Sequence, residues 1–248
     1  MIMLVTVAVL GTTVYRMWHV HAREQAEEQF QSAREQAEAA LQQRDFRTAA
    51  LKFQSACEAL DILGRDDVLA QKIRQMLREA TAASRLATQS LLTIIEEAHQ
   101  TLSPPRAKTE GNLNARTDSQ PLYAGQWIVM ESTVISEMGA DGAVRYVIDY
   151  PLTVDGTTVV IDAELSVFEP LMVDKRPKTI IFAAQLEGCR LTKTLQPTLW
   201  VDLRDESAFL WTSYENYSAL GLQIDGPQME QQLRRVLDAQ ARIVGVEP

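Results

Sequence analysis

The stretch "VRYVIDYPLTVDGTTVVIDAELSV", Val144 to Val167, decides the fold of the second half of this chain. Apolar residues occupy every second position on both sides of Asp155 and Gly156, and this alternation is typical of strands with one buried face. An Asp-Gly pair is a strong signal for a two-residue hairpin turn, because both residue types tolerate a positive φ. The stretch therefore predicts a β-hairpin.

Further strand-like segments lie on either side of this hairpin. The segment "QWIVMESTVISEM" precedes it and ends at the turn "GADG", while "KTIIFAAQLEGC" and "PTLWVDLRD" follow it. Five or six strands in about 100 residues predict a small antiparallel β-barrel or sandwich, for which an OB-like barrel is one candidate. The final segment, "DGPQMEQQLRRVLDAQARIV", has a proline suited to a first helical turn and an apolar stripe, so it predicts a C-terminal helix.

The first half of the chain has a helical period. Residues 21–102 contain no proline and are rich in Ala, Gln, Glu, Arg and Leu, a composition that favours helices. Apolar residues recur there at spacings of three and four, in three successive stripes. Asp45 is suited to cap the second helix and Gly64 to end it, and the third stripe indicates one long helix or two helices joined near Thr88.

Together these patterns predict an α+β chain. The segment between the helical and β regions is rich in Pro, Asn, Ser and Thr and reads as a linker. The predicted parts are an N-terminal membrane-spanning helix at 1–20, a helical region at 21–102, a linker at 103–121, a β domain at 122–226 and a C-terminal helix at 227–248.

The first fifteen residues, "MIMLVTVAVLGTTVY", carry no charge before Arg16. Fifteen residues of helix span about 22 Å, short of the roughly 30 Å hydrocarbon core. Extension to Val20 brings the length near 20 residues and places Trp18 at an interface. We expect a single-pass membrane anchor, with most of the chain in the cell envelope and the orientation open. A cleavable signal peptide and a buried helix are the alternatives.

The stretch "LQQRDFRTAALKFQSACEAL", Leu41 to Leu60, resembles the core of a tetratricopeptide repeat. The residues at that family's small and aromatic positions are Leu41, Phe46, Ala49, Phe53 and Ala56. Arg44 stands where the family usually has glycine, Gly64 stands near the place of its closing proline, and the sequence has no second copy. A binding solenoid needs about three stacked repeats, so two readings stay open: a packed helical hairpin or a peptide-binding groove.

The order of the segments also carries a resemblance. The expected membrane anchor comes first and is followed by charged helices with a repeat-like unit. Next come a helix ending in "SLLTIIEEA" and a β domain that runs from "YAGQWIVMESTV" to "PTLWVDLRDESAFLWTSYENY". This order resembles uncharacterised bacterial membrane-anchored proteins that join a tetratricopeptide-like helical region to a C-terminal β domain. The resemblance implies an envelope location and transfers no activity.

Charge and cysteine content narrow the class of function. The net charge is −9, and residues 121–226 hold 15 acidic and 7 basic residues, which opposes nucleic-acid binding. Cys57 and Cys189 are expected to be buried free thiols, or a disulfide if the protein is exported. Because the sequence has no Cys/His ligand spacing and no nucleotide-binding motif, we expect no metal and no cofactor.

Few residues suit catalysis. Asp162 and Glu164 lie two positions apart on one strand face, as an acid–base pair or a calcium site requires, although solvated alternation explains them equally well. No histidine is placed in the sequence to serve as a catalytic partner, because His19 and His21 flank the expected membrane span and His99 lies near the end of the third helical stripe, so we expect no catalytic residue.

Three functional hypotheses follow. The first is a membrane-tethered, non-enzymatic interaction or scaffold protein, which binds a protein partner through Phe46 and Phe53 or through the β-domain surface. The second makes the β domain a module for a small or extended ligand, with the aromatic residues Trp127, Trp200 and Trp211 around its mouth. The third is a hydrolase based on the two carboxylates. The third helical stripe also suits a short coiled coil, which leaves open a homo-oligomer formed through the long helix.

Overall fold

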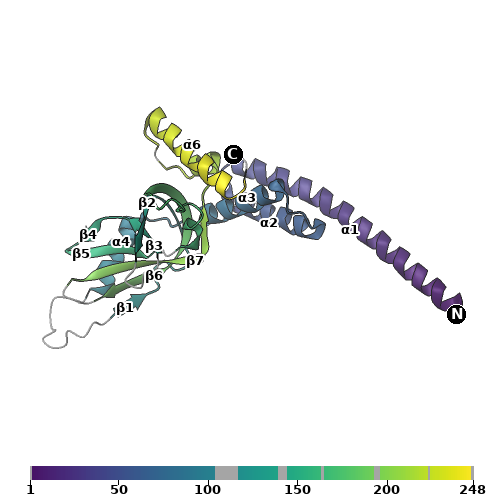
Figure 1. The fold of residues 1–248 in the computed structure, drawn as a ribbon, viewed down its shortest axis with the longest axis horizontal. Helices are drawn as coiled ribbons and strands as arrows, with labels where there is room; N and C mark the ends of the chain where they lie inside the picture. Colours follow the sequence, from purple (N-terminus) through teal and green to yellow (C-terminus); the bar gives the residue numbers. More distant parts are fainter. Residues whose placement is uncertain are drawn as a thin grey trace. The chain divides into compact units, whose positions relative to one another are not determined.

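The computed structural model describes residues 2–103, 117–138, 144–162, 165–192, 196–222 and 224–246 (Figure 1). The chain divides into two compact units, one up to Ser84 and the other from Arg85 to Val246.

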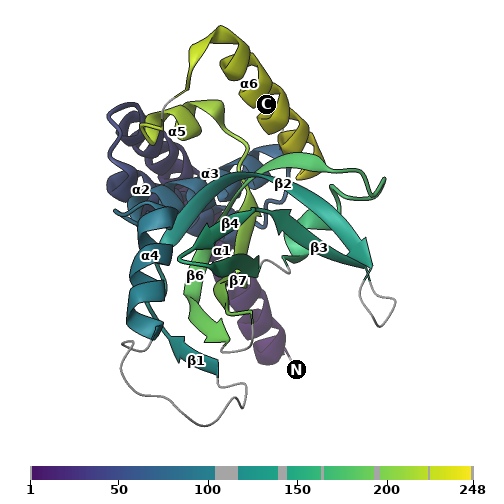
Figure 2. The ribbon, with the colours of Figure 1, turned by 90° about the vertical axis from the view of Figure 1, so that its left-hand side faces the viewer.

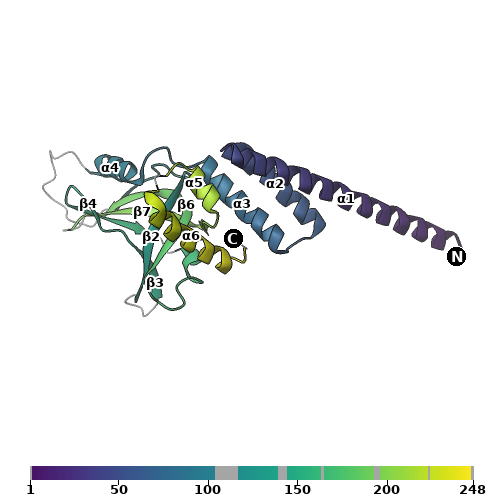
Figure 3. The same ribbon diagram turned by 90° about the horizontal axis from the view of Figure 1, so that it is seen from above.

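The first unit consists of the helices α1 (Ile2–Gln42), α2 (Phe46–Leu63) and α3 (Val68–Ser84). α2 packs along the C-terminal part of α1, and α3 packs against α2 (Figure 3). Since α1 has 41 residues and α2 has 18, α1 continues well beyond the end of its neighbour.

Small residues dominate the core of this unit. Nine of its fourteen buried residues are alanine, and side chains of that size let helix backbones approach closely. The larger buried residues supply most of the apolar volume: Phe30, Phe53, Cys57, Leu60 and Ile73.

The ends of α2 agree with their sequence signals. Asp45 precedes the helix and its Oδ1 accepts a hydrogen bond from the Thr48 amide at 3.0 Å, which confirms the predicted N-cap. Gly64 follows the helix with a φ of 65°, the left-handed conformation in which glycine commonly ends helices. The turn between α1 and α2 contains Arg44, which has a φ of 59° although it carries a side chain.

The conformation of Arg44 leads to the first testable prediction. A left-handed φ destabilises the folded state by about 1–2 kcal/mol when the residue has a Cβ. Glycine avoids this cost, but its more flexible unfolded chain loses more entropy on folding, which cancels part of the gain. We expect Arg44→Gly to raise the free energy of unfolding of the helical unit by about 0.5–1 kcal/mol. Urea unfolding followed by circular dichroism measures this change. As a control, Arg47→Gly places glycine inside α2 and is expected to lower stability; stabilisation by both variants, or by neither, would contradict the argument.

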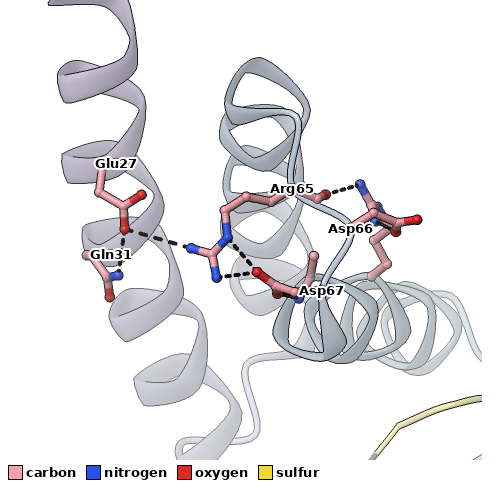
Figure 4. A network of polar contacts seen from close by, with 7 residues as sticks. Glu27, Gln31, Arg65, Asp66 and Asp67 are labelled. Atoms are coloured by element: carbon pink, nitrogen blue, oxygen red, sulfur yellow. Dashed lines mark hydrogen bonds and ion pairs between the residues drawn. The ribbon is translucent and has the colours of Figure 1, made fainter. Parts of the chain in front are cut away.

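Arg65 ties the three helices of this unit together (Figure 4). Its Nη2 lies 2.9 Å from Asp67 Oδ2 at the start of α3, and its Nη1 lies 3.8 Å from Glu27 Oε1 on α1. The guanidinium also covers the ring of Phe30, with 5.2 Å from Cζ to the ring centroid. The residue after the helix-ending glycine thus links the α2–α3 turn to α1.

Arg74 holds the same turn from the side of α3. Its guanidinium donates to Asp66 at 2.9 Å, to Asp61 at 3.1 Å and to the carbonyl oxygen of Arg65 at 3.2 Å. These contacts, together with those of Arg65 (Figure 4), therefore fix how α3 leaves α2.

The expected membrane anchor at residues 1–20 is wrong. Among the residues that the structure describes, no helix combines the length and the apolar content needed to cross a membrane. α1 instead runs without a break from Ile2 to Gln42, and its uncharged stretch ends at Arg16, after too few residues to span the hydrocarbon core. The single-pass membrane localisation inferred from this segment is corrected with it.

The second unit is built on one curled sheet (Figure 2). Its strands follow the order β3-β2-β6-β7-β5-β4, and β1 pairs with β6 beside this path. The strands are β1 (Thr117–Gln120), β2 (Trp127–Met138), β3 (Val144–Asp149), β4 (Leu152–Val154), β5 (Thr157–Asp162), β6 (Lys178–Thr192) and β7 (Thr198–Leu210). The described pairs are antiparallel except for β5 with β7, which is parallel.

Helices with a curled sheet are what the α+β composition predicted, but the sheet itself differs from the expectation. It is a half-barrel with one parallel pair, not an antiparallel barrel or a sandwich. Alternation in the sequence shows which residues face a core, but it does not show which strands become neighbours. The parallel pair joins strands separated in the sequence by the whole of β6.

The predicted hairpin is confirmed, with shorter strands. β4 and β5 pair across Asp155 and Gly156, whose φ values of 48° and 80° suit a two-residue turn. The strand expected over 144–154 is interrupted at Tyr150 and Pro151, since proline has no N–H for a strand ladder. β3 and β4 consequently stand at opposite ends of the strand order although only two residues separate them.

The returning strand also ends earlier than expected. β5 is described as far as Asp162, and Ser166 and Val167, which were expected to continue it, lie in a short 3-10 helix, η1 (Ser166–Phe168). Residues 163 and 164 lie outside the described part of the chain, as do residues 104–116 of the predicted linker. The end of that linker forms β1.

The third predicted helix is divided between the two units. It breaks after Ser84, where the Trp127 amide donates to the Arg85 carbonyl and the Ala87 amide donates to the Trp127 carbonyl. The second half becomes α4 (Leu91–Leu102), which contributes Ile94, Ile95, Ala98 and Leu102 to the core of the sheet. The boundary between the units therefore precedes α4 instead of following it.

Two further helices complete the second unit, α5 (Tyr214–Ala219) and α6 (Gly226–Ile243). Gln240 on α6 is buried and bonds to the sheet backbone: its Oε1 accepts from the Ile181 amide at 2.8 Å, and its Nε2 donates to the carbonyls of Ile181 and Trp211 at 2.7 and 2.6 Å. The side-chain amide of Gln240 thus makes the two hydrogen bonds to the backbone of Ile181 that a neighbouring strand would make.

Candidate functional site

The aromatic residues proposed for the helical unit do not form an exposed pair. Phe53 is fully buried in the core between the helices, whereas Phe46, at the start of α2, is half-buried. Phe53 therefore contributes to packing, and only Phe46 offers part of its ring to a partner.

The three tryptophans proposed to line a cleft lie in two places. Trp127 and Trp211 are buried on either side of Phe209, with centroid distances of 5.7 and 5.9 Å. Trp200 is half-buried and lies under Arg190, whose Cζ is 4.6 Å from its ring centroid. The structure does not bring these tryptophans together around an open mouth, so the ligand-binding hypothesis gains no support from them.

Asp162, proposed as a catalytic carboxylate, belongs to an ion cluster across three strands. Arg190 Nη2 donates to Asp162 Oδ2 at 2.6 Å, and Arg190 Nε donates to both oxygens of Asp202 at 2.9 and 3.0 Å. One arginine thereby balances two carboxylates on the neighbouring strands β5 and β7. Glu164, the other member of the proposed pair, lies outside the described residues.

No sequence pattern singles out Asp202, the third member of this cluster. It is the register partner of Asp162 in the parallel β5–β7 pair, a relation that no local pattern reveals. Burial raises the pKa of Asp202 above its usual value, against the hydrogen bonds from Arg190 that lower it. Because the arginine occupies the carboxylates, the cluster serves to join the strands and does not present a general base.

His99 is also in a setting that its sequence neighbours did not suggest. Its Nε2 lies 3.0 Å from Thr157 Oγ1 and 3.2 Å from Ser103 Oγ, and its Nδ1 lies 3.9 Å from Asp155 Oδ2. The order serine, histidine, aspartate is that of a nucleophilic site. Here, however, the carboxylate is 84 % exposed and beyond hydrogen-bond distance, and the threonine shares the nitrogen that would take the serine proton. We interpret the cluster as the polar contact that fastens α4 to the β4–β5 hairpin.

Metal and thiol chemistry have little basis in the described residues. They contain no group of three His, Cys, Asp or Glu side chains placed to hold a metal ion. Cys57 and Cys189 are buried free thiols, and burial raises the pKa of each to about 11, so neither is a reactive thiolate at neutral pH.

The two most exposed large apolar side chains among the described residues of the second unit are Val173 and Met138, and Met138 lies at one end of the β2–β3 pair. β2 pairs with β6 only as far as Val134; the residues after it, as far as the description extends, pair with β3 alone and form a two-stranded ribbon (Figure 2). At its end Met138, 75 % exposed, is the register partner of Val144, 39 % exposed.

The loop before β6 reaches the same end of the ribbon. Ser136 Oγ donates to the Lys175 carbonyl at 3.2 Å, and Val173, two residues earlier in that loop, is 82 % exposed. The exposed residues Lys175 and Arg176 follow it. We call this surface the ribbon tip; it comprises Met138, Val144, Val173, Lys175 and Arg176.

Basic charge is concentrated around the ribbon tip. Four of the seven basic residues between positions 121 and 226 lie on or beside it: Arg145, Lys175, Arg176 and Lys178. Among the residues that the structure describes, two acidic ones lie with them: Glu137 is the register partner of Arg145, and Asp174 Oδ1 lies 3.1 Å from Lys178 Nζ. The tip is thus a basic, apolar spot on a unit that is acidic overall.

Comparison of this chain with protein-family models, with curated proteins and with solved structures gives no match. The resemblances to a tetratricopeptide repeat and to bacterial membrane-anchored proteins therefore stay predictions.

Proposed function

We propose that this chain is a non-enzymatic interaction protein that docks a partner protein through the ribbon tip. The observation that carries the proposal is the high exposure of two apolar side chains: Met138 at the end of the ribbon, and Val173 in the loop that contacts the ribbon through Ser136. Side chains of this kind become favourable contacts when a partner removes them from water, at about 25 cal/mol per Å² of apolar surface. A well-filled apolar centre with a polar rim is the usual anatomy of such interfaces.

The charge around the tip indicates the chemistry of the partner. Lys175 and Arg176 follow Val173 closely in the loop, on a unit that is acidic overall. Opposite charges steer association and disfavour wrong partners. The proposed partner is therefore a protein segment with an apolar anchor side chain flanked by carboxylates.

Site-specific photo-crosslinking tests the proposal. A photoreactive amino acid at Val173 is expected to capture one defined protein in cells that make this chain. The same probe at Met229, an exposed apolar site on α6 that is 50 % accessible, serves as the control. The captured protein is then purified, and its affinity is measured with the unmodified chain and with the Lys175→Glu, Arg176→Glu double variant. Reversal of the two rim charges is expected to weaken binding about tenfold, or ~1.4 kcal/mol.

Two results would overturn this function. One is an identical set of crosslinked proteins from the Val173 and Met229 probes. The other is an affinity for the captured protein that the charge reversal leaves unchanged, since a contact independent of the rim would not be the one proposed.

A further inference from the structure

β3 offers a strand edge to another chain. It stands at one end of the strand order, and within the described part of the sheet it pairs with β2 alone (Figure 2). The outer edge of such a strand presents backbone N–H and C=O groups that a further strand can pair with. The strand reads Val-Arg-Tyr-Val-Ile-Asp; it contains no proline, and its two charged residues are opposite in sign.

The sequence of β3 is complementary to itself. If a second copy lies antiparallel with Val147 opposite its own equivalent, Arg145 of each copy lies opposite Asp149 of the other. Tyr146 then lies opposite Ile148. The side chains of Arg145 and Asp149 are both exposed. Opposite charges directly across a strand pair stabilise it, and a two-fold axis makes the contact twice.

Other registers lose this match. A shift of two residues places Arg145 or Asp149 opposite an apolar residue, and a shift of one residue sets each side chain against one that points to the other face. This register is possible whichever alternate residues of β3 direct their backbone N–H and C=O groups outward. Val147 and its equivalent then form either a hydrogen-bonded or a non-hydrogen-bonded pair, and both kinds alternate along any antiparallel ladder.

The intramolecular neighbours of these residues are compatible with the arrangement. Across β2, Glu137 is the register partner of Arg145 and Thr133 is the register partner of Asp149. The arginine of one copy would therefore lie between Glu137 of its own chain and Asp149 of the second copy. The aspartate would have a neutral residue on its inner side and a cation on its outer side, with no like charge directly across either strand pair.

We propose that this protein forms a symmetric dimer by antiparallel pairing of β3 with β3 of a second copy. The pairing joins the two sheets edge to edge across a two-fold axis at Val147. This interface goes beyond the proposed docking at the ribbon tip and does not depend on it, because it uses the backbone edge and the Arg145–Asp149 pairs. A dimer would present two ribbon tips, so a partner with two docking segments would bind with avidity.

Reciprocal charge reversal tests the dimer with the full chain. Sedimentation equilibrium of the unmodified protein at micromolar concentration is expected to give twice the chain mass of 27.8 kDa. Arg145→Asp and Asp149→Arg each replace both attractive pairs with repulsive ones, so each variant alone is expected to dissociate at least about tenfold more readily. In an equimolar mixture the two variants are complementary, and a heterodimer is expected.

The double variant Arg145→Asp, Asp149→Arg keeps the experiment decisive if one single variant does not fold. Within one chain the exchanged charges are again complementary across the axis, so the double variant is expected to dimerise. Circular dichroism shows whether each variant is folded. A monomeric unmodified protein, or dimerisation that neither single variant weakens, would overturn the proposal. The rim variant Lys175→Glu, Arg176→Glu should stay dimeric, which separates failure of the dimer from failure of the docking function.

Discussion

Replacement of Gln240 by leucine is expected to lower the free energy of unfolding of the second unit by about 3 kcal/mol. The side chain is buried, and it bonds to the Ile181 amide and to the carbonyls of Ile181 and Trp211. The Ile181 carbonyl keeps a second donor, the Trp211 amide at 2.9 Å. Leucine therefore orphans two buried backbone groups, each of which costs about 1–3 kcal/mol when unsatisfied.

Urea unfolding followed by tryptophan fluorescence measures this change, because Trp127, Trp200 and Trp211 all lie in the second unit. Gln232→Leu is the matched control: the same substitution on the same helix, at an exposed position, where we expect a change within about 0.5 kcal/mol. Equal effects of the two variants would show that α6 is held by its apolar face alone and that the three bonds of Gln240 add nothing.

The contrast between the β4–β5 hairpin and Gln240 shows where sequence reasoning succeeds in this fold. Asp155 and Gly156 specify their turn through their own backbone preferences, so the hairpin follows from two adjacent residues. Gln240 acts on Ile181, 59 residues earlier in the chain, and on a helix it is indistinguishable from the exposed glutamines beside it. Contacts of this length depend on the packing of the whole unit, which no local pattern contains.

The same distinction explains the candidate site. The Asp162–Arg190–Asp202 cluster requires a parallel β5–β7 pair, and the His99 cluster requires α4 to reach the β4–β5 hairpin. The ribbon tip depends on a contact between Ser136 and a loop 39 residues later. The loop itself carries a run of basic residues, but nothing local in the sequence relates that loop to the end of β2.

The correction at the N-terminus has a different origin. Residues 1–15 are uncharged, but the helix that contains them continues far into charged sequence, and the apolar part is too short to span a membrane. The prediction depended on adding residues beyond Arg16 to reach the required length. An apolar segment that reaches the length of a membrane span only when charged residues are counted gives weak physical support for a membrane anchor.

The largest single effect in the helical unit is expected from Phe53→Ala, a loss of about 4 kcal/mol. Phe53 is fully buried, and most of its buried neighbours are alanines, which are too small to move into the space that a ring leaves. The cost therefore includes the cavity as well as the lost transfer of the ring from water. Hydrogen exchange resolved along the chain measures it, as lost protection of α2 with protection of β6 retained.

Leu51→Ala provides the control for this prediction. Leu51 lies on the same helix two residues earlier and is 64 % exposed, so its truncation is expected to change stability by less than about 0.5 kcal/mol. Phe53 was proposed from the sequence as a contact for a partner, and its complete burial assigns it to the core. If Phe53→Ala left the protection of α2 intact, the helices could not be packed around this ring, and an exposed, partner-binding phenylalanine would have to be considered again.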